Sequence, residues 1–126
     1  MKTKWLNRTL VLGPYLCLCL SEDEYRAAAK HRGWPPDDDV WCNSNGGRTH
    51  IEVDCPNPTA IVCIDAPEFG SVGIAGLLAH EATHIWLDWL RSMGEDSPGD
   101  EISAYAIQNL VVLLMDEWHR RTEAGV

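Results

Sequence analysis

Two histidines and a glutamate at fixed spacing are the residues of this sequence best suited to chemistry. They stand in the run His80-Glu81-Ala82-Thr83-His84, an HExxH pattern. On a helix the two histidines differ by about 40° around the axis, so both imidazoles can bind one metal ion. A zinc ion held there lowers the pKa of a bound water to about 7, and Glu81 as general base can pass the proton of that water to a leaving amine. The spacing therefore predicts hydrolytic chemistry with one Zn²⁺ per chain.

A third metal ligand is predicted at Glu101, seventeen residues after His84. Gly94 ends the helix that carries the motif and Pro98 begins the next one, so a tight turn would return Glu101 toward the histidines. Asp100 is the alternative ligand. A plain helix-terminal charge is the other interpretation of Glu101, since acidic residues are favoured in a first helical turn.

Tyr105 follows Glu101 by one helical turn and is the second candidate catalytic residue after Glu81. In the cleft, its phenol would donate a hydrogen bond to the oxyanion of a tetrahedral intermediate. The alternative is a tyrosine packed at the edge of the core with its hydroxyl satisfied.

The HExxH run together with the later glutamate resembles the gluzincin branch of the zincin metallopeptidases. The ending Glu101-Ile102-Ser103-Ala104-Tyr105 further resembles small zincins encoded by phages and prophages. The resemblance covers roughly residues 70–120. It implies a minimal metallopeptidase with His80 and His84 as ligands, Glu81 as base and Glu101 on a following glutamate helix. Large gluzincins carry an aspartate where this chain has Tyr105, so Asp88 or a backbone carbonyl would orient a ligand histidine instead. The residues after His84 include no third histidine, which excludes a metzincin.

The elements that must hold these residues change character at Gly70, within a single domain of residues 1–126. Residues 1–70 are mainly strands with one short helix, and residues 71–121 form two long helices. The sequence therefore predicts an α+β fold, in which a small mixed sheet of three to five strands packs on the HExxH helix and the glutamate helix.

Apolar and alternating runs mark the expected strands. The candidates are 8–12, 15–20, 48–54 and 60–65, with 40–42 as a brief strand or a loop. The segments 48–54 and 60–65 are expected to pair antiparallel. Ala60–Ile64 is either an edge strand that holds a peptide by strand addition or an ordinary core strand. The Ser21-to-Glu24 capping pattern predicts a short helix that begins after Ser21 and continues from Tyr25 to Lys30.

Charge and cysteine content limit the class of protein. The net charge of −9 disfavours nucleic acid and favours a basic peptide or protein as substrate or partner. No apolar run is long enough to span a membrane. Five cysteines without a CxxC pair indicate a reducing compartment, and Cys17 and Cys19 are expected to be small core residues. The expected location is cytoplasmic, in a bacterial host if the chain is phage-encoded as the resemblance implies, with an N-terminal secretory signal less favoured.

Two classes of function fit these patterns, and the zinc chemistry of the first would also hydrolyse a non-peptide amide. The first is a zinc-dependent metallopeptidase in which Glu81 activates a metal-bound water. The alternative is a binding or inhibitory protein of zincin fold, of phage origin by the resemblance, whose metal is structural and which catalyses nothing. The sequence leaves the oligomeric state and the substrate open.

Overall fold

Three strands form one mixed sheet in the computed structural model, which describes residues 2–6, 14–35 and 40–123. They are β1 (Tyr15–Cys19), β2 (Gly47–Glu52) and β3 (Thr59–Ile64). The order in the sheet is β1-β3-β2, with β3 parallel to β1 and antiparallel to β2. The expected antiparallel pair is thus confirmed. The expected strand at 8–12 lies outside the described residues, and residues 40–42 form a loop.

The central position of β3 overturns the suggestion that this strand is a peptide-binding edge. All six of its residues are buried, because one face packs on α1 and the other on the two long helices. A strand covered on both faces has a continuous apolar sequence, as Ala60–Ile64 has. The core-strand alternative is confirmed, and β2 is the outer strand on that side of the sheet.

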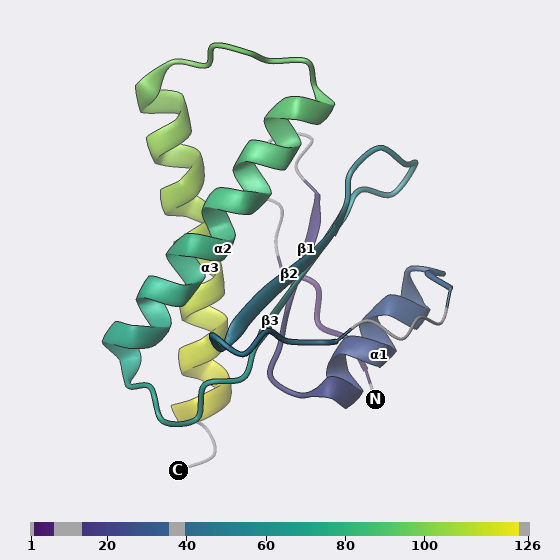
Figure 1. Ribbon diagram of the computed structural model, residues 1–126, viewed down its shortest axis with the longest axis vertical. Helices are drawn as coiled ribbons and strands as arrows, with labels where there is room; N and C mark the ends of the chain where they lie inside the picture. Colours follow the sequence, from purple (N-terminus) through teal and green to yellow (C-terminus); the bar gives the residue numbers. More distant parts are fainter. Residues whose placement is uncertain (1, 7–13, 36–39, 124–126) are drawn as a thin grey trace.

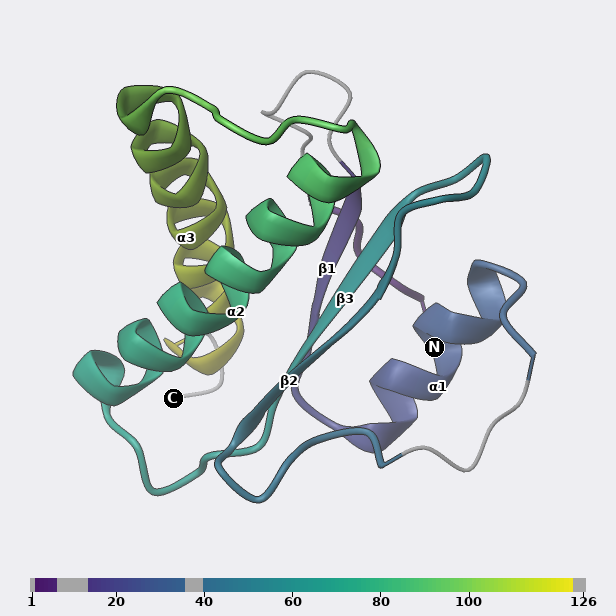
Figure 2. The same cartoon turned by 45° about the horizontal axis from the view of Figure 1, so that its top comes forward.

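Alternation along the strands divides the interior into two layers on either side of the sheet (Figures 1 and 2). Leu16, Leu18 and Val62 belong to the larger cluster, which packs against the two long helices. Their neighbours Cys17 and Cys63 belong to a smaller cluster that packs against α1. The period of two in a strand explains this division.

The helix α1 (Glu22–His31) begins at the predicted cap. The Ser21 hydroxyl accepts a hydrogen bond from the Glu24 N–H at 3.2 Å, and the Glu24 carboxylate accepts one from the Leu20 N–H at 3.1 Å. These bonds satisfy backbone donors that the first helical turn leaves open. The short helix is therefore confirmed, with its N-cap at Ser21 as predicted.

The two long helices are α2 (Ser71–Ser92) and α3 (Asp100–Glu123), which pack against each other and on the same face of the sheet (Figure 1). Gly94 ends α2 at φ +71°, with its N–H bonded to the Arg91 carbonyl, a conformation that favours glycine. The expected Pro98 start of α3 is wrong by two residues. The Ser97 N–H is bonded to the Glu95 carboxylate, and Gly99 provides the first helical acceptor.

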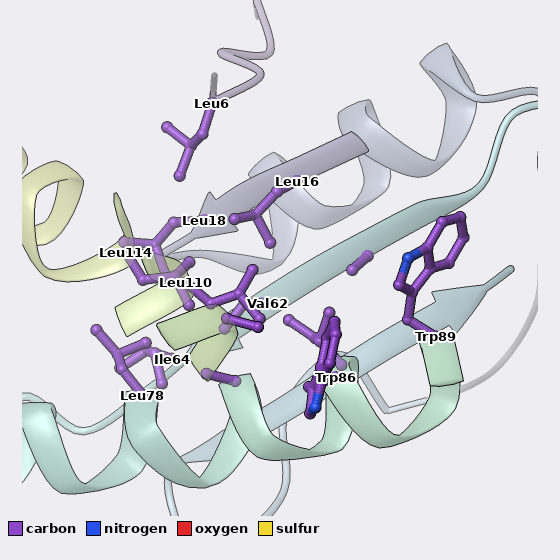
Figure 3. Packing of buried hydrophobic residues seen from close by; sticks show 14 of the residues in the cluster. Leu6, Leu16, Leu18, Val62, Ile64, Leu78, Trp86, Trp89, Leu110 and Leu114 are labelled. Carbon is purple, nitrogen blue, oxygen red and sulfur yellow. The ribbon is translucent and has the colours of Figure 1, made fainter. Parts of the chain in front are cut away.

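The main core lies between the sheet and these two helices (Figure 3). Leu78, Ile85 and Leu114 are fully buried there. Burial of such side chains contributes roughly 1.5–3 kcal/mol each. The packing fixes which face of α2 points inward and leaves the two histidines exposed on the flank that faces β2. In the described part of the chain, no helix is long and apolar enough to cross a membrane.

The cysteines on the α1 face are buried thiols, as predicted. The Sγ atoms of Cys17 and Cys19 lie 4.0 Å apart on one side of β1. Burial raises the pKa of the Cys42 thiol, and a hydrogen bond to Cys19 together with burial raises the pKa of Cys63. Neutral thiols such as Cys42 and Cys63 fill space as small apolar groups. Hydrogen bonds with Cys17 and Cys63 lower the pKa of the Cys19 thiol, although burial opposes them.

Candidate metal centre

His80 and His84 lie one turn apart on the exposed side of α2, and their rings approach each other. The two Nε2 atoms are 3.1 Å apart, and the rings meet edge to face with centroids 4.7 Å apart. Two nitrogen ligands at about 2.05 Å on a tetrahedral zinc ion would be roughly 3.3 Å apart. The observed separation is that of a hydrogen bond between the two rings, and it is close to the spacing of two histidine ligands of one metal ion.

Glu81 lies beside the histidines but is almost fully buried, with 4% of its surface exposed. Its Oε1 accepts a hydrogen bond of 2.9 Å from the Thr49 hydroxyl of β2. Gly47 lies on the same face of β2, and a Cβ added there would be 3.8 Å from the Glu81 Cδ, which is ordinary van der Waals contact. The edge strand thus holds this carboxylate in one orientation.

A pocket of about 370 Å³ opens between α2 and β2 around these residues. It is polar, and its walls come from the motif helix, the edge strand and the loop that leads into that strand. The lining residues are Asn43, Asn45, Gly47, Arg48, Thr49, Ile51, His80, Glu81, His84 and Asp88. The HExxH motif therefore faces a polar pocket large enough for part of a substrate.

Neither Glu101 nor Tyr105 lines this pocket. Both are exposed on α3, Tyr105 by 60% of its surface. The Trp86 indole N–H donates to the Ser103 hydroxyl at 2.9 Å, which holds the start of α3 against one flank of α2 while the histidines face β2 on the other. Among the described residues, no group of three or more His, Cys, Asp or Glu side chains could hold a metal ion. The structure brings together His80, Glu81 and His84 and leaves Glu101 apart.

The two aspartates considered as helpers are placed differently. Asp88 lines the pocket and forms its ion pair with Arg91, one turn along α2. Asp100 is exposed at the first residue of α3. Asp88 is therefore the carboxylate beside the motif, while Asp100 shares the remote position of Glu101.

Sequence reasoning did not identify Thr49, Asn45 or Arg48 as site residues. Thr49 carried one usable signal, because it shares a strand face with Ile51, the face expected to be inward. Asn45 accepts the Gly47 N–H at 3.1 Å through Oδ1, so its NH₂ is directed elsewhere. Their approach to the motif depends on how β2 pairs and on which flank of α2 it meets, which local sequence does not encode.

Comparison with known proteins adds no relatives to this picture. No protein family, curated protein or solved structure matches the chain. The geometry alone therefore decides which chemistry the site can support: two converging imidazoles, one oriented carboxylate and several hydrogen-bond donors around a polar pocket.

Proposed function

We propose that this protein is a zinc-dependent hydrolase of peptide bonds, with His80 and His84 as metal ligands and Glu81 as general base. One observation carries the proposal: the Nε2 atoms of the two histidines are 3.1 Å apart, as two ligands of one zinc ion would be. The hydrogen-bonded carboxylate of Glu81 on the same side of α2 adds to it.

The orientation of Glu81 suits a proton-transfer role. Zinc bound by the two histidines would supply an acidic water and polarise a carbonyl oxygen. The Oε1 atom of Glu81 accepts a hydrogen bond from the Thr49 hydroxyl. The other carboxylate oxygen, Oε2, would therefore take a proton from the attacking water and deliver it to the leaving nitrogen. With Tyr105 outside the pocket, the NH₂ of Asn45 becomes the candidate donor to the oxyanion.

The edge strand supports a peptide as the substrate. β2 is an outer strand, and within the described ranges no further strand pairs with its free side. An extended peptide could add to that side through main-chain hydrogen bonds while its neighbouring carbonyl reaches the pocket. A small non-peptide amide would gain nothing from this strand.

Zinc bound by the two histidines would need one further protein ligand, for which Asp88 and Glu101 are the candidates. Asp88 already lines the pocket, whereas Glu101 would have to reach the other flank of α2. Asp88→Asn and Glu101→Ala, compared for zinc affinity, separate these choices. Loss of the true ligand should weaken binding at least tenfold, because one of three protein ligands disappears.

A binding or inhibitory protein with a structural metal is the second candidate. Two observations favour it. Among the described residues no third ligand joins His80 and His84. Tyr105, the expected oxyanion donor, is exposed outside the pocket. Such a protein would keep its biological effect in the Glu81→Gln variant, because that change removes the base and leaves both histidines in place.

The first test is the metal content of the purified, untagged protein by native mass spectrometry and elemental analysis. One zinc per chain, lost in His84→Ala and kept in the control His31→Ala, would support the site. His31 is an exposed histidine on α1, on the other side of the sheet. Absence of zinc after purification and after zinc addition would refute the proposal. For a zinc-loaded protein, Glu81→Gln then distinguishes hydrolysis from binding.

A further inference from the structure

A second pocket lies between α1 and β2. Its volume is about 540 Å³, which is in the range of small-molecule sites. Arg32 and Trp34, just after α1, form part of its wall, and His50 and Glu52 of β2 form another part. His80, Glu81 and His84, the residues of the proposed zinc site, do not line it.

Arg32 has an unusual environment in this wall. Its guanidinium carbon lies 5.0 Å from the ring centroid of Trp5 and 4.8 Å from that of Tyr15. Nε and Nη1 are buried, and neither has a hydrogen-bond partner among the described residues. Buried donors are almost always paired with protein, water or a ligand, so two such donors on one cation point to a missing acceptor.

The other cationic groups of the pocket are already engaged. Arg48 donates to the Val40 carbonyl, and the His50 Nε2 lies 3.1 Å from the Trp41 carbonyl. The His50 ring also packs on Tyr25 at a centroid distance of 4.2 Å. Arg32 is therefore the cation of this pocket whose buried donors have no acceptor among the described residues.

The lining also indicates the charge and shape of that acceptor. Glu52 brings one negative charge to the pocket, so a singly charged anion is favoured over a doubly charged phosphate. Trp34 and Pro35 provide apolar wall for the rest of the molecule. A planar guanidinium recognises a planar carboxylate through paired N–H donors.

We infer that this pocket is a binding site for a carboxylate with an apolar body, and that Arg32 is its anchor. The carboxylate belongs to a free small molecule or to a peptide, since both present the same group. The inference does not depend on the proposed hydrolase activity.

The test begins with the wild-type chain and two probes of equal shape, benzoate and benzamide. Calorimetry gives their affinities, and ¹H–¹⁵N NMR follows the Arg32 Nε–H resonance. We expect benzoate to bind at least tenfold more tightly than benzamide and to shift that resonance, because only benzoate can accept from the guanidinium as an anion. Equal affinities, or no binding, would overturn the inference, and no carboxylate ligand would then be assigned to the Arg32 donors.

Two variants then assign the effect to Arg32. Arg32→Met keeps an apolar stem between the two rings and should weaken benzoate binding at least tenfold. Arg91→Gln makes the same charge change at an exposed position on α2 and should leave it unchanged. Equal losses in both variants would overturn the assignment, because net charge would then explain them.

A peptide with a free C-terminus and its C-terminal amide identify the source of the carboxylate. Binding of the free-acid peptide alone, in competition with benzoate, points to a chain terminus. Benzoate binding without peptide binding points to a small molecule. The wild-type probe comparison remains decisive if Arg32→Met fails to fold, which circular dichroism would reveal.

Discussion

At the residue scale, the hydrogen bond between Thr49 and Glu81 is the contact that distinguishes an oriented base from a mobile carboxylate. The hydroxyl lies 2.9 Å from Oε1, and among the described residues it is the hydrogen-bond donor to this nearly buried carboxylate. Thr49→Val keeps the shape of the side chain and removes the donor. We expect kcat to fall about tenfold with KM and zinc content little changed, since the bond orients the base without contacting substrate.

The control for this prediction is Thr83→Val on α2. The Thr83 hydroxyl bonds to the Ala79 carbonyl within the helix and makes no contact with Glu81. Its loss should leave kcat unchanged. Thr49→Ser should restore most of the activity, because the donor returns. A Thr49→Val enzyme with normal kcat would show that Glu81 needs no orienting partner.

Glu117 provides a second residue-scale prediction, concerned with acid stability. Hydrogen bonds from Arg120, at 2.6 and 2.9 Å, and from Lys4, at 3.0 Å, lower the pKa of this buried carboxyl, although burial opposes them. The folded pKa lies below the unfolded one, so the stabilisation is present above the unfolded value and is lost as pH falls through the folded value.

We expect the free energy of unfolding to fall by about 1 kcal/mol between pH 5 and pH 3. This value is at the low end for hydrogen bonds to a charged group, because the Lys4 and Arg120 side chains are half exposed. Urea unfolding at several pH values measures it. Glu117→Gln should be less stable than wild type at pH 7 and should lack this part of the acid-induced loss. Parallel pH curves for the two proteins would contradict the assignment.

At the element scale, the sequence predicted most helices and strands but not how they assemble. The capping pattern at Ser21, the helical run 71–92 and the antiparallel partners of β2 and β3 depend on local periodicity and turn chemistry. The parallel pairing of β1 with β3 was not predicted, because α1 and β2 separate the two strands in the chain. Long-range pairing of this kind has no local signal.

The same difference between local and long-range information explains which residues of the candidate site could be predicted. His80, Glu81 and His84 come together because helical spacing alone determines their relation. To place Glu101 near the histidines, the sequence would have had to predict on which flank of α2 the helix α3 packs. The Trp86 to Ser103 hydrogen bond and the packing of Leu110 and Leu114 determine that flank, and no motif in the sequence encodes it.

The packing of α3 on the sheet has a direct test. Leu114 is fully buried in the main core, whereas Val112, on the same helix, has 58% of its surface exposed. Leu114→Ala should lower the free energy of unfolding by about 2–5 kcal/mol, because it removes buried methyl groups and leaves a cavity. Val112→Ala should change it by less than about 0.5 kcal/mol. Denaturant unfolding of both variants compares them, and similar values would mean that α3 packs in another orientation.

At the scale of the whole molecule, two sites of different character meet at β2, where Arg48, Thr49 and Ile51 line both pockets. The α2 face carries histidines and a carboxylate suited to a cation, and the α1 face carries an arginine suited to an anion. The chain as a whole has a net charge of −9. A cation such as zinc is therefore attracted by the overall field as well as by the local ligands, whereas a carboxylate has to be recognised against that field.

The thermal stability of the whole chain provides the last prediction, because a metal that binds only the folded state raises the melting temperature. At a free zinc concentration of 100 Kd, the expected stabilisation is about 2.7 kcal/mol, or roughly 10 °C for a domain of this size. His84→Ala should remove the shift. Cys55 is the exposed thiol and can bind zinc weakly, so Cys55→Ser serves as the background for every measurement. A melting temperature that ignores zinc in that background would mean that the HExxH spacing is a coincidence of helix geometry, and the binding-protein function, without a metal, would then be favoured.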